Sequence, residues 1–139
     1  MAVFLNNTVG LKINAIDLSD HVTSVTLNYA ADELEVTAMG DTAHKFVKGL
    51  ESGTLTVSLL NDTATSNVLQ TLNAAFGTTV AVKMVQAKVP AVSATNPLYT
   101  FDILVNNLTP IAGAVGDIGS QELSFTINSA VTVATTGTF

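Results

Sequence analysis

The chain has 139 residues, of which 47% are hydrophobic and only 12% charged, and its five lysines, absent arginine and 11 acids give a net charge of −6. This length predicts a single domain over residues 1–139, and the charge argues against a protein that grips nucleic acid, because such proteins neutralise phosphates with lysine and arginine. The absence of cysteine excludes disulfides and thiol chemistry, and no run approaches the ~20 apolar residues of a membrane-spanning helix.

Two strands are predicted near the start of the chain, over residues 11–16 and 22–30. The second reads VTSVTLNYA, in which apolar Val25 and Leu27 alternate with uncharged polar residues. This alternation is typical of a strand with one buried face. A weaker alternation continues through residues 33–36, so the strand is expected to run on toward the next segment.

The segment 32–62 begins and ends like a strand, but its middle follows neither a strand nor a helix period. Gly40 and Gly49 interrupt it, and a long connection of this kind is usually functional or disordered. Its apolar residues argue against disorder, so we predict an extended assembly loop at about residues 37–52 that reaches for a partner. The candidate contact residues are Met39, Asp41, His44, Lys45, Phe46, Val47 and Leu50.

The rest of the chain alternates between strand and loop signals, with one helix. Residues 54–60 alternate strictly, as in a half-buried strand. A helix is predicted over 66–76, with cap candidates at 62–66 and Gly77 at its end. Further strands are predicted over 78–87, 99–105 and 123–127, and a flexible tail over 129–139 that adds an edge strand or pairs with another subunit. These elements predict a mainly β fold, an antiparallel sandwich or open barrel with one flanking α-helix.

Catalytic and metal-binding signals are weak. A nucleophile relay would need His21 beside Ser19 and Asp20, but no motif spacing supports it, and neither His21 nor His44 has the neighbours of a metal site. Two solvated loop histidines are the simpler interpretation. The glycines of 113–116 lack the lysine and helix of a phosphate loop. The sequence therefore predicts a protein that is not an enzyme and has no cofactor or metal ion.

The surface is predicted to be poor in charge and rich in apolar groups. A typical soluble domain is about 25% charged, and the mean hydropathy here is +0.45. Exposed apolar area beyond a few hundred Å² normally marks an interface, so self-association is the favoured explanation. The first ten residues lack the basic segment of a secretory signal, which predicts a chain made and used without such export.

Three segments together resemble the major tail tube protein of long-tailed (siphovirus-type) bacteriophages. They are ELEVTAMGDTAHK at 33–45, SATNPLY at 93–99 and GAVGD at 113–117, and the resemblance extends over about residues 17–128. Their specificity lies in occurring together in this order. The resemblance implies a β sandwich with a flanking helix, assembled as hexameric rings that stack into the hollow tail tube through which phage DNA passes into the host.

The resemblance also implies partners and a location. The chain would assemble with itself, with a tape measure protein and with tail terminator and tip proteins, in the host cytoplasm and then in the virion tail, without a membrane. DNA would pass without specific binding, because six chains of charge −6 give a ring of −36 that offers phosphates no cationic site. Acids on polar strand faces are lumen candidates, with outward solvent as the equal alternative: Glu33, Glu35, Asp102 and Glu122.

Two alternatives stay open on the sequence alone. A monomeric β-sandwich binding or decoration module would favour clustered exposed aromatic residues, yet the chain has no tryptophan and only Tyr29 and Tyr99 as tyrosines. A tube subunit of a contractile tail or secretion apparatus differs by a surrounding sheath, which the sequence does not reveal.

Overall fold

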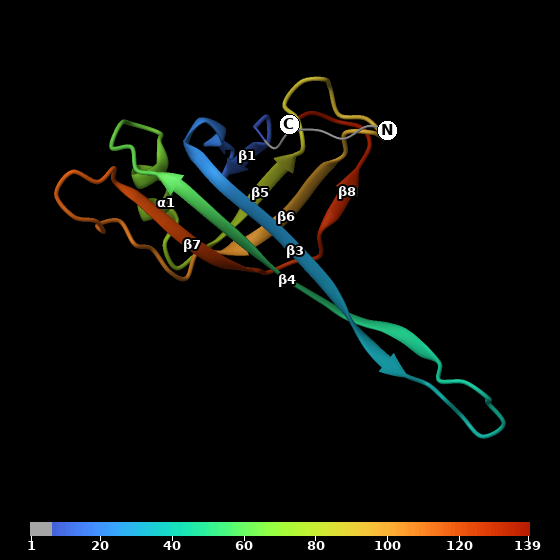
Figure 1. Ribbon diagram of the computed structural model, residues 1–139. Coiled ribbons are helices and arrows are strands. Elements are labelled where there is room, and N and C mark those ends of the chain that lie inside the picture. The colour runs from blue at the N-terminus through green and yellow to red at the C-terminus, as the bar shows by residue number, and fades with distance from the viewer. Residues whose placement is uncertain (1–6) are drawn as a thin grey trace.

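The computed structural model describes residues 7–139, which form one antiparallel sheet and one α-helix (Figure 1). The sheet order is β2-β1-β5-β6-β7-β4-β3, and β8 pairs with β6. The predicted class, mainly antiparallel β with one flanking helix, is confirmed, and the strands form a single open sheet. The elements are β1 Gly10–Ile13, β2 Ile16–Asp17, a 3₁₀ turn η1 Ser19–His21, β3 Val22–Glu35, β4 Phe46–Leu60, α1 Val68–Ala75, β5 Thr79–Val85, β6 Leu98–Leu104, β7 Ser120–Ile127 and β8 Thr132–Ala134.

The core lies on one face of the sheet. Leu55 pairs with Phe125, and Val57 with Leu123, and all four side chains are buried. The sheet curls so that β3 lies opposite β5 and β6 across a groove of about 490 Å³, lined in part by Tyr29. Burying alternate side chains in this way supplies the main driving force for the fold.

Helix α1 closes one end of this core. Val68, Leu72 and Ala75 are buried in it, and Gly77 takes the left-handed conformation (φ +80°) that ends many helices. The helix is shorter than the predicted 66–76 because Ser66 has a φ of +61°, outside the helical range. Asp62, a predicted cap, instead accepts a hydrogen bond from the Ala64 amide and organises the turn before the helix.

The opposite face of the sheet is a surface of small polar side chains. Successive cross-strand rows on β3, β4 and β7 hold almost only hydroxyl and amide groups, because these positions alternate with the buried ones. We call this surface the polar face. Its rows are Ser24, Ser58 and Glu122; Thr26, Thr56 and Ser124; and Asn28, Thr54 and Thr126.

Both ends of the chain depart from the prediction. The first strand stops at Ile13 because the two residues after it, 14 and 15, have positive φ angles of 53° and 66°. The tail 129–139 was predicted to be flexible and either to add an edge strand or to pair with another subunit. Residues 132–134 form the added strand, β8, against β6, where β7 pairs only with residues 103 and 104. The Lys12 ammonium lies 4.6 Å from the centre of the Phe139 ring, and the same ring lies against Gly10.

Candidate assembly surfaces

The hairpin β3–β4 extends far beyond the sheet. β4 pairs with β7 only through residues 54–60, whereas β3 and β4 continue to pair from Ala30 with Ser52 to Glu35 with Phe46. We call residues 30–52 the arm. In Figure 1 the arm projects from the body as an isolated two-stranded ribbon. Nearly all of its side chains are exposed, so the subunit alone does not bury it.

The arm corrects the predicted loop at 37–52. β4 already begins at Phe46, so only the tip, residues 36–45, lacks strand structure. Backbone pairing holds the rest: Glu33 pairs with Lys48, next to a register shift at Asp32. Gly49 makes this shift possible, because a Cβ there would lie 2.9 Å from the Asp32 Cβ. Strand pairing without a buried face leaves no hydrophobic period, and the sequence pattern therefore missed it.

Asp41 organises the tip of the arm. Its carboxylate accepts a hydrogen bond from the Ala38 amide at 2.9 Å and contacts the Lys45 ammonium at 2.6 Å. These two contacts hold the pKa of Asp41 below its ordinary value, the Lys45 hydrogen bond contributing most. The Asp41 amide bonds back to the Ala38 carbonyl, while Gly40 has a φ of +95°. The tip is thus a turn held in place by hydrogen bonds and an ion pair of Asp41.

The basic side chains of the arm are already paired with acids of the arm. Besides Lys45 with Asp41, His44 contacts Glu35 at 3.1 Å, and Lys48 contacts Glu51. The arm therefore offers a partner no unpaired lysine, and it does offer exposed apolar side chains. Phe46 lies on one side of the ribbon with Lys48, and Val47 lies on the other with Leu34. The register shift between Lys48 and Glu51 puts Leu50 on the side of Val47. The exposed apolar side chains are Leu34, Val36, Met39, Phe46, Val47 and Leu50.

The four lumen candidates fall into two groups. Asp102 and Glu122 alternate with buried neighbours and so lie on the side of the sheet opposite the core. Glu122 belongs to the polar face, where it stands beside Ser58. Glu33 and Glu35 lie on the arm, outside the body of the sheet. The sequence grouped these acids together, and the structure separates them into two places.

A second exposed apolar surface was missed. The loop between β6 and β7 presents Ile111, Val115 and Ile118, with exposed fractions of 93%, 107% and 76%. The sequence shows branched apolar residues interspersed among glycines in this loop, but the glycines were considered only as a phosphate-loop candidate and as part of the family resemblance. We call these three side chains the loop surface.

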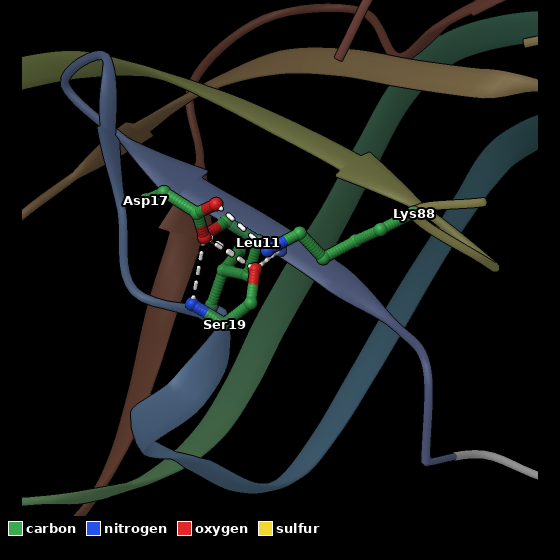
Figure 2. A network of polar contacts seen from close by, with 4 residues as sticks. All are labelled: Leu11, Asp17, Ser19 and Lys88. Carbon is green, nitrogen blue, oxygen red and sulfur yellow. Dashed lines mark hydrogen bonds and ion pairs between the residues drawn. The ribbon is translucent and has the colours of Figure 1, made fainter. Parts of the chain in front are cut away.

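A polar network fastens β1 and β2 to the chain after β5 (Figure 2). The Ser19 hydroxyl accepts a hydrogen bond from the Leu11 amide and donates to Asp17, whose other oxygen lies 3.0 Å from the Lys88 ammonium. Partial burial raises the pKa of Asp17, but the hydrogen bonds from Ser19 and the charge of Lys88 together outweigh it, so the pKa is below its ordinary value.

The histidines lie in different settings. His21 is not a solvated loop residue as predicted: its side chain is 21% exposed, and Nε2 lies 2.9 Å from Asp62. Ser19 bonds to Asp17 instead, so the suspected relay is not assembled. The Ala64 amide, followed by His21, holds the pKa of Asp62 below its ordinary value. Within residues 7–139 no three histidine or acidic side chains gather as a metal site.

No helix in the described part of the chain has the length and apolar character to cross a bilayer.

No protein-family model matches the sequence, and no curated protein is significantly similar to it. Solved structures are similar in fold. A chain in the virion of a native gene transfer agent particle aligns with a TM-score of 0.73 and 12% identity, over 95% of this chain and 99% of that one. A chain in the tail of an empty gene transfer agent particle, refined with helical and C6 symmetry, aligns with a TM-score of 0.58 and 14% identity, over 96% and 99%.

Proposed function

We propose that this chain is the tube subunit of a phage-like tail, closing into hexameric rings that stack into a hollow tube. The observation that carries the proposal is the fold that it shares, over 96% of its length, with a chain of a C6-symmetric tail. The protein is structural rather than enzymatic, is located in the virion after assembly in the host cytoplasm, and has itself as its main partner. A tape measure protein and tail terminator and tip proteins are further partners.

The free edge of β3 supports ring closure. Within residues 7–139 β3 pairs only with β4, which leaves one edge of a strand of 14 residues open. Natural proteins seldom leave so long an edge unprotected, and adding a neighbour's strand satisfies its backbone groups. Six copies joined edge to edge would turn each open sheet into part of one closed barrel, which has no edges.

The polar face supports a lumen that DNA slides through. Its rows carry hydroxyl and amide groups, with Glu122 as the charged member of the nine. Such a surface offers phosphates no cation to bind, which suits passage better than retention. Asp102 lies farther along the same side of the sheet, where exposed Lys83 of β5 is close to it. We propose that Asp102 and Glu122 face this lumen and that the arm, with Glu33 and Glu35, connects subunits.

Electron microscopy of the purified protein over a range of concentrations tests the proposal. We expect six-fold rings and stacked tubes, and light scattering should show large assemblies appearing as the concentration rises. A protein that stays monomeric at high concentration, with no rings or tubes, would contradict the proposal. The unmodified chain serves here, since it has no cysteine that could oxidise.

A further inference from the structure

A row of cross-strand partners runs over β1, β5, β6 and β8 on the side of the sheet that faces away from the core. Lys12 is the partner of Lys83. Lys83 is in turn the partner of Thr100, and Thr100 is the partner of Thr132. Direct partners point to the same side of a sheet, and neighbouring strands are about 4.8 Å apart, so the row is on the order of 14 Å long. We call these four residues the lysine row.

Lys12 and Lys83 have no acid as an ion-pair partner within residues 7–139. Asp102 of β6 is diagonal to Lys83 across the sheet, and yet the two form no ion pair. Like charges directly opposite each other destabilise a sheet, so this pair costs the subunit stability. The other lysines of the chain each lie against a carboxylate: Lys45 with Asp41, Lys48 with Glu51 and Lys88 with Asp17.

The Lys12 side chain is held in place by an aromatic ring. Its ammonium lies 4.6 Å from the centre of the Phe139 ring, a distance at which a cation is attracted to an aromatic face. Gly10 leaves the space for this ring, because a Cβ there would lie 2.8 Å from it. The ring orders the ammonium without neutralising its charge. An ordered side chain loses less conformational freedom when a partner binds.

The neighbouring Asp17 indicates which anion suits the row. Asp17 is the partner of Lys12 on β2, but its carboxylate accepts a hydrogen bond from the Ser19 hydroxyl and lies 3.0 Å from the Lys88 ammonium. One hydroxyl and one ammonium group thus bind a carboxylate at this edge of the sheet. The lysine row offers the same two kinds of group. The chain has no arginine, the side chain best matched to phosphate, so a carboxylate is the favoured occupant.

We propose that the lysine row binds an acidic polypeptide segment of a partner protein, with a carboxylate held between Lys12 and Lys83. This inference goes beyond the proposed function and does not depend on it. The net charge of −6 does not prevent such binding, because five of the 11 acids lie in the arm and physiological salt screens charges over about 8 Å. The contact should therefore weaken as salt rises.

Fluorescence anisotropy of a labelled hexaglutamate peptide tests the proposal, with the full chain kept below the concentration at which it assembles. We expect binding at low salt that Lys83→Gln weakens by about fivefold, the effect of losing one ion pair of about 1 kcal/mol. The matched control, Lys45→Gln, makes the same change in net charge on a lysine already paired with Asp41. The control protein should bind the peptide like the unmodified chain.

Three results of the binding measurement would overturn the inference. The first is an unmodified subunit that does not bind the peptide at low salt. The second is equal affinity in the Lys83→Gln and Lys45→Gln proteins. The third is tighter binding of short duplex DNA than of hexaglutamate, which would assign the row to phosphate. The measurement uses the subunit alone, so it decides the inference whether or not tubes form.

Stability and tube growth of the Lys83→Gln protein give a second readout. The substitution removes a repulsion, so it should raise the melting temperature slightly at low salt, and this gain should fade as salt rises. A lowered melting temperature would show that an acid of the same chain, such as Asp102, neutralises Lys83, which would overturn the inference. Tube growth should be unchanged. Weakened growth would assign the row to a second copy of this chain and overturn the choice of partner.

Discussion

The two halves of the β3–β4 hairpin share one antiparallel pairing and differ in what covers them. In the body, residues 22–29 and 53–60 alternate between buried or half-buried and polar side chains, and β7 pairs with the far edge of β4. In the arm, residues 30–52 have no third strand, and Leu50 is 81% exposed. An isolated two-stranded ribbon is marginally stable in water.

This difference supports the proposal that the arm serves assembly rather than the stability of the subunit. Its apolar side chains are as large as those of the body, but within the subunit they gain little from leaving water. Its charges and its tip are nevertheless ordered by specific contacts of Asp41, Lys45 and Lys48. The body should therefore determine folding, and the arm should determine whether tubes form.

Truncating a phenylalanine in each region gives the largest expected contrast. Phe125 is fully buried opposite Leu55, so Phe125→Ala should cost about 3–5 kcal/mol of unfolding free energy. The melting temperature should fall by on the order of 10 °C. Phe46→Ala in the arm should change the unfolding free energy by less than about 0.5 kcal/mol and yet weaken tube growth. Thermal unfolding and electron microscopy measure the two effects.

An equal loss of stability in the two alanine variants would break this comparison. It would show that Phe46 packs against the body in solution and belongs to the subunit's own fold. Loss of tubes only in the Phe125→Ala protein would show that Phe46 is not needed for tube growth.

Removing the arm comes next in expected effect. Ala30 and Ser52 are cross-strand partners, so an Asn-Gly turn joining them in place of residues 31–51 preserves the register of the body. We expect a folded subunit with nearly unchanged melting temperature that forms no tubes. Circular dichroism and light scattering check the two parts. A truncated chain that unfolds without cooperativity would show that the arm takes part in folding.

The body was predictable from the sequence because one face of each of its strands is buried. Strict alternation placed β4 at 54–60, and the same logic found β6 and β7 within a few residues. The paired part of the arm, 46–52, was not predictable in this way. Both its faces are exposed, so selection imposes no period-two pattern, and Gly49 was interpreted as a loop residue rather than as part of a strand pair.

The candidate surfaces were predicted unevenly for the same reason. The apolar arm residues were noticed because they had no core to join. The loop surface was overlooked because Ile111, Val115 and Ile118 follow no period, and only coordinates tell an exposed isoleucine from a buried one. An edge strand in the tail was one of two alternatives. Its partner could not be predicted, because the place of β8 depends on the edge that β7 leaves open on β6.

A charge reversal on the polar face should have a smaller effect, confined to DNA passage. Glu122 is exposed, so Glu122→Lys should change the unfolding free energy by about 0.5 kcal/mol or less and leave tube growth intact. The tubes should then retain short duplex DNA at low salt and release it as salt rises. A filter-retention assay measures this. Glu33→Lys makes the same change on the arm and should retain less DNA.

Retention that is equal in the two lysine variants would place the acids of the arm in the lumen as well. Tubes of Glu122→Lys protein that retain no DNA at low salt would show that the polar face does not line the channel. In either case the division between the body and the arm would need to be redrawn.

The smallest expected effect concerns the two carboxylates with lowered pKa values, Asp17 in the body and Asp41 in the arm. A carboxylate whose folded-state pKa is depressed stabilises the fold fully above its ordinary value of 3.8, and this stabilisation is lost as pH falls through the lower folded-state value. Asp17→Asn should therefore lower the melting temperature slightly at neutral pH, and the difference from the unmodified chain should shrink as the pH falls below 3.8. The loss should be about 1 kcal/mol or less, because Asp17 is more than a third exposed and solvent screens its pair with Lys88.

Asp41→Asn should leave the melting temperature unchanged at every pH, since the arm can open while the body stays folded. Thermal unfolding of the three proteins from about pH 7 to about pH 3 decides the matter, and a pH-dependent loss in the Asp41→Asn protein would couple the tip of the arm to the stability of the body.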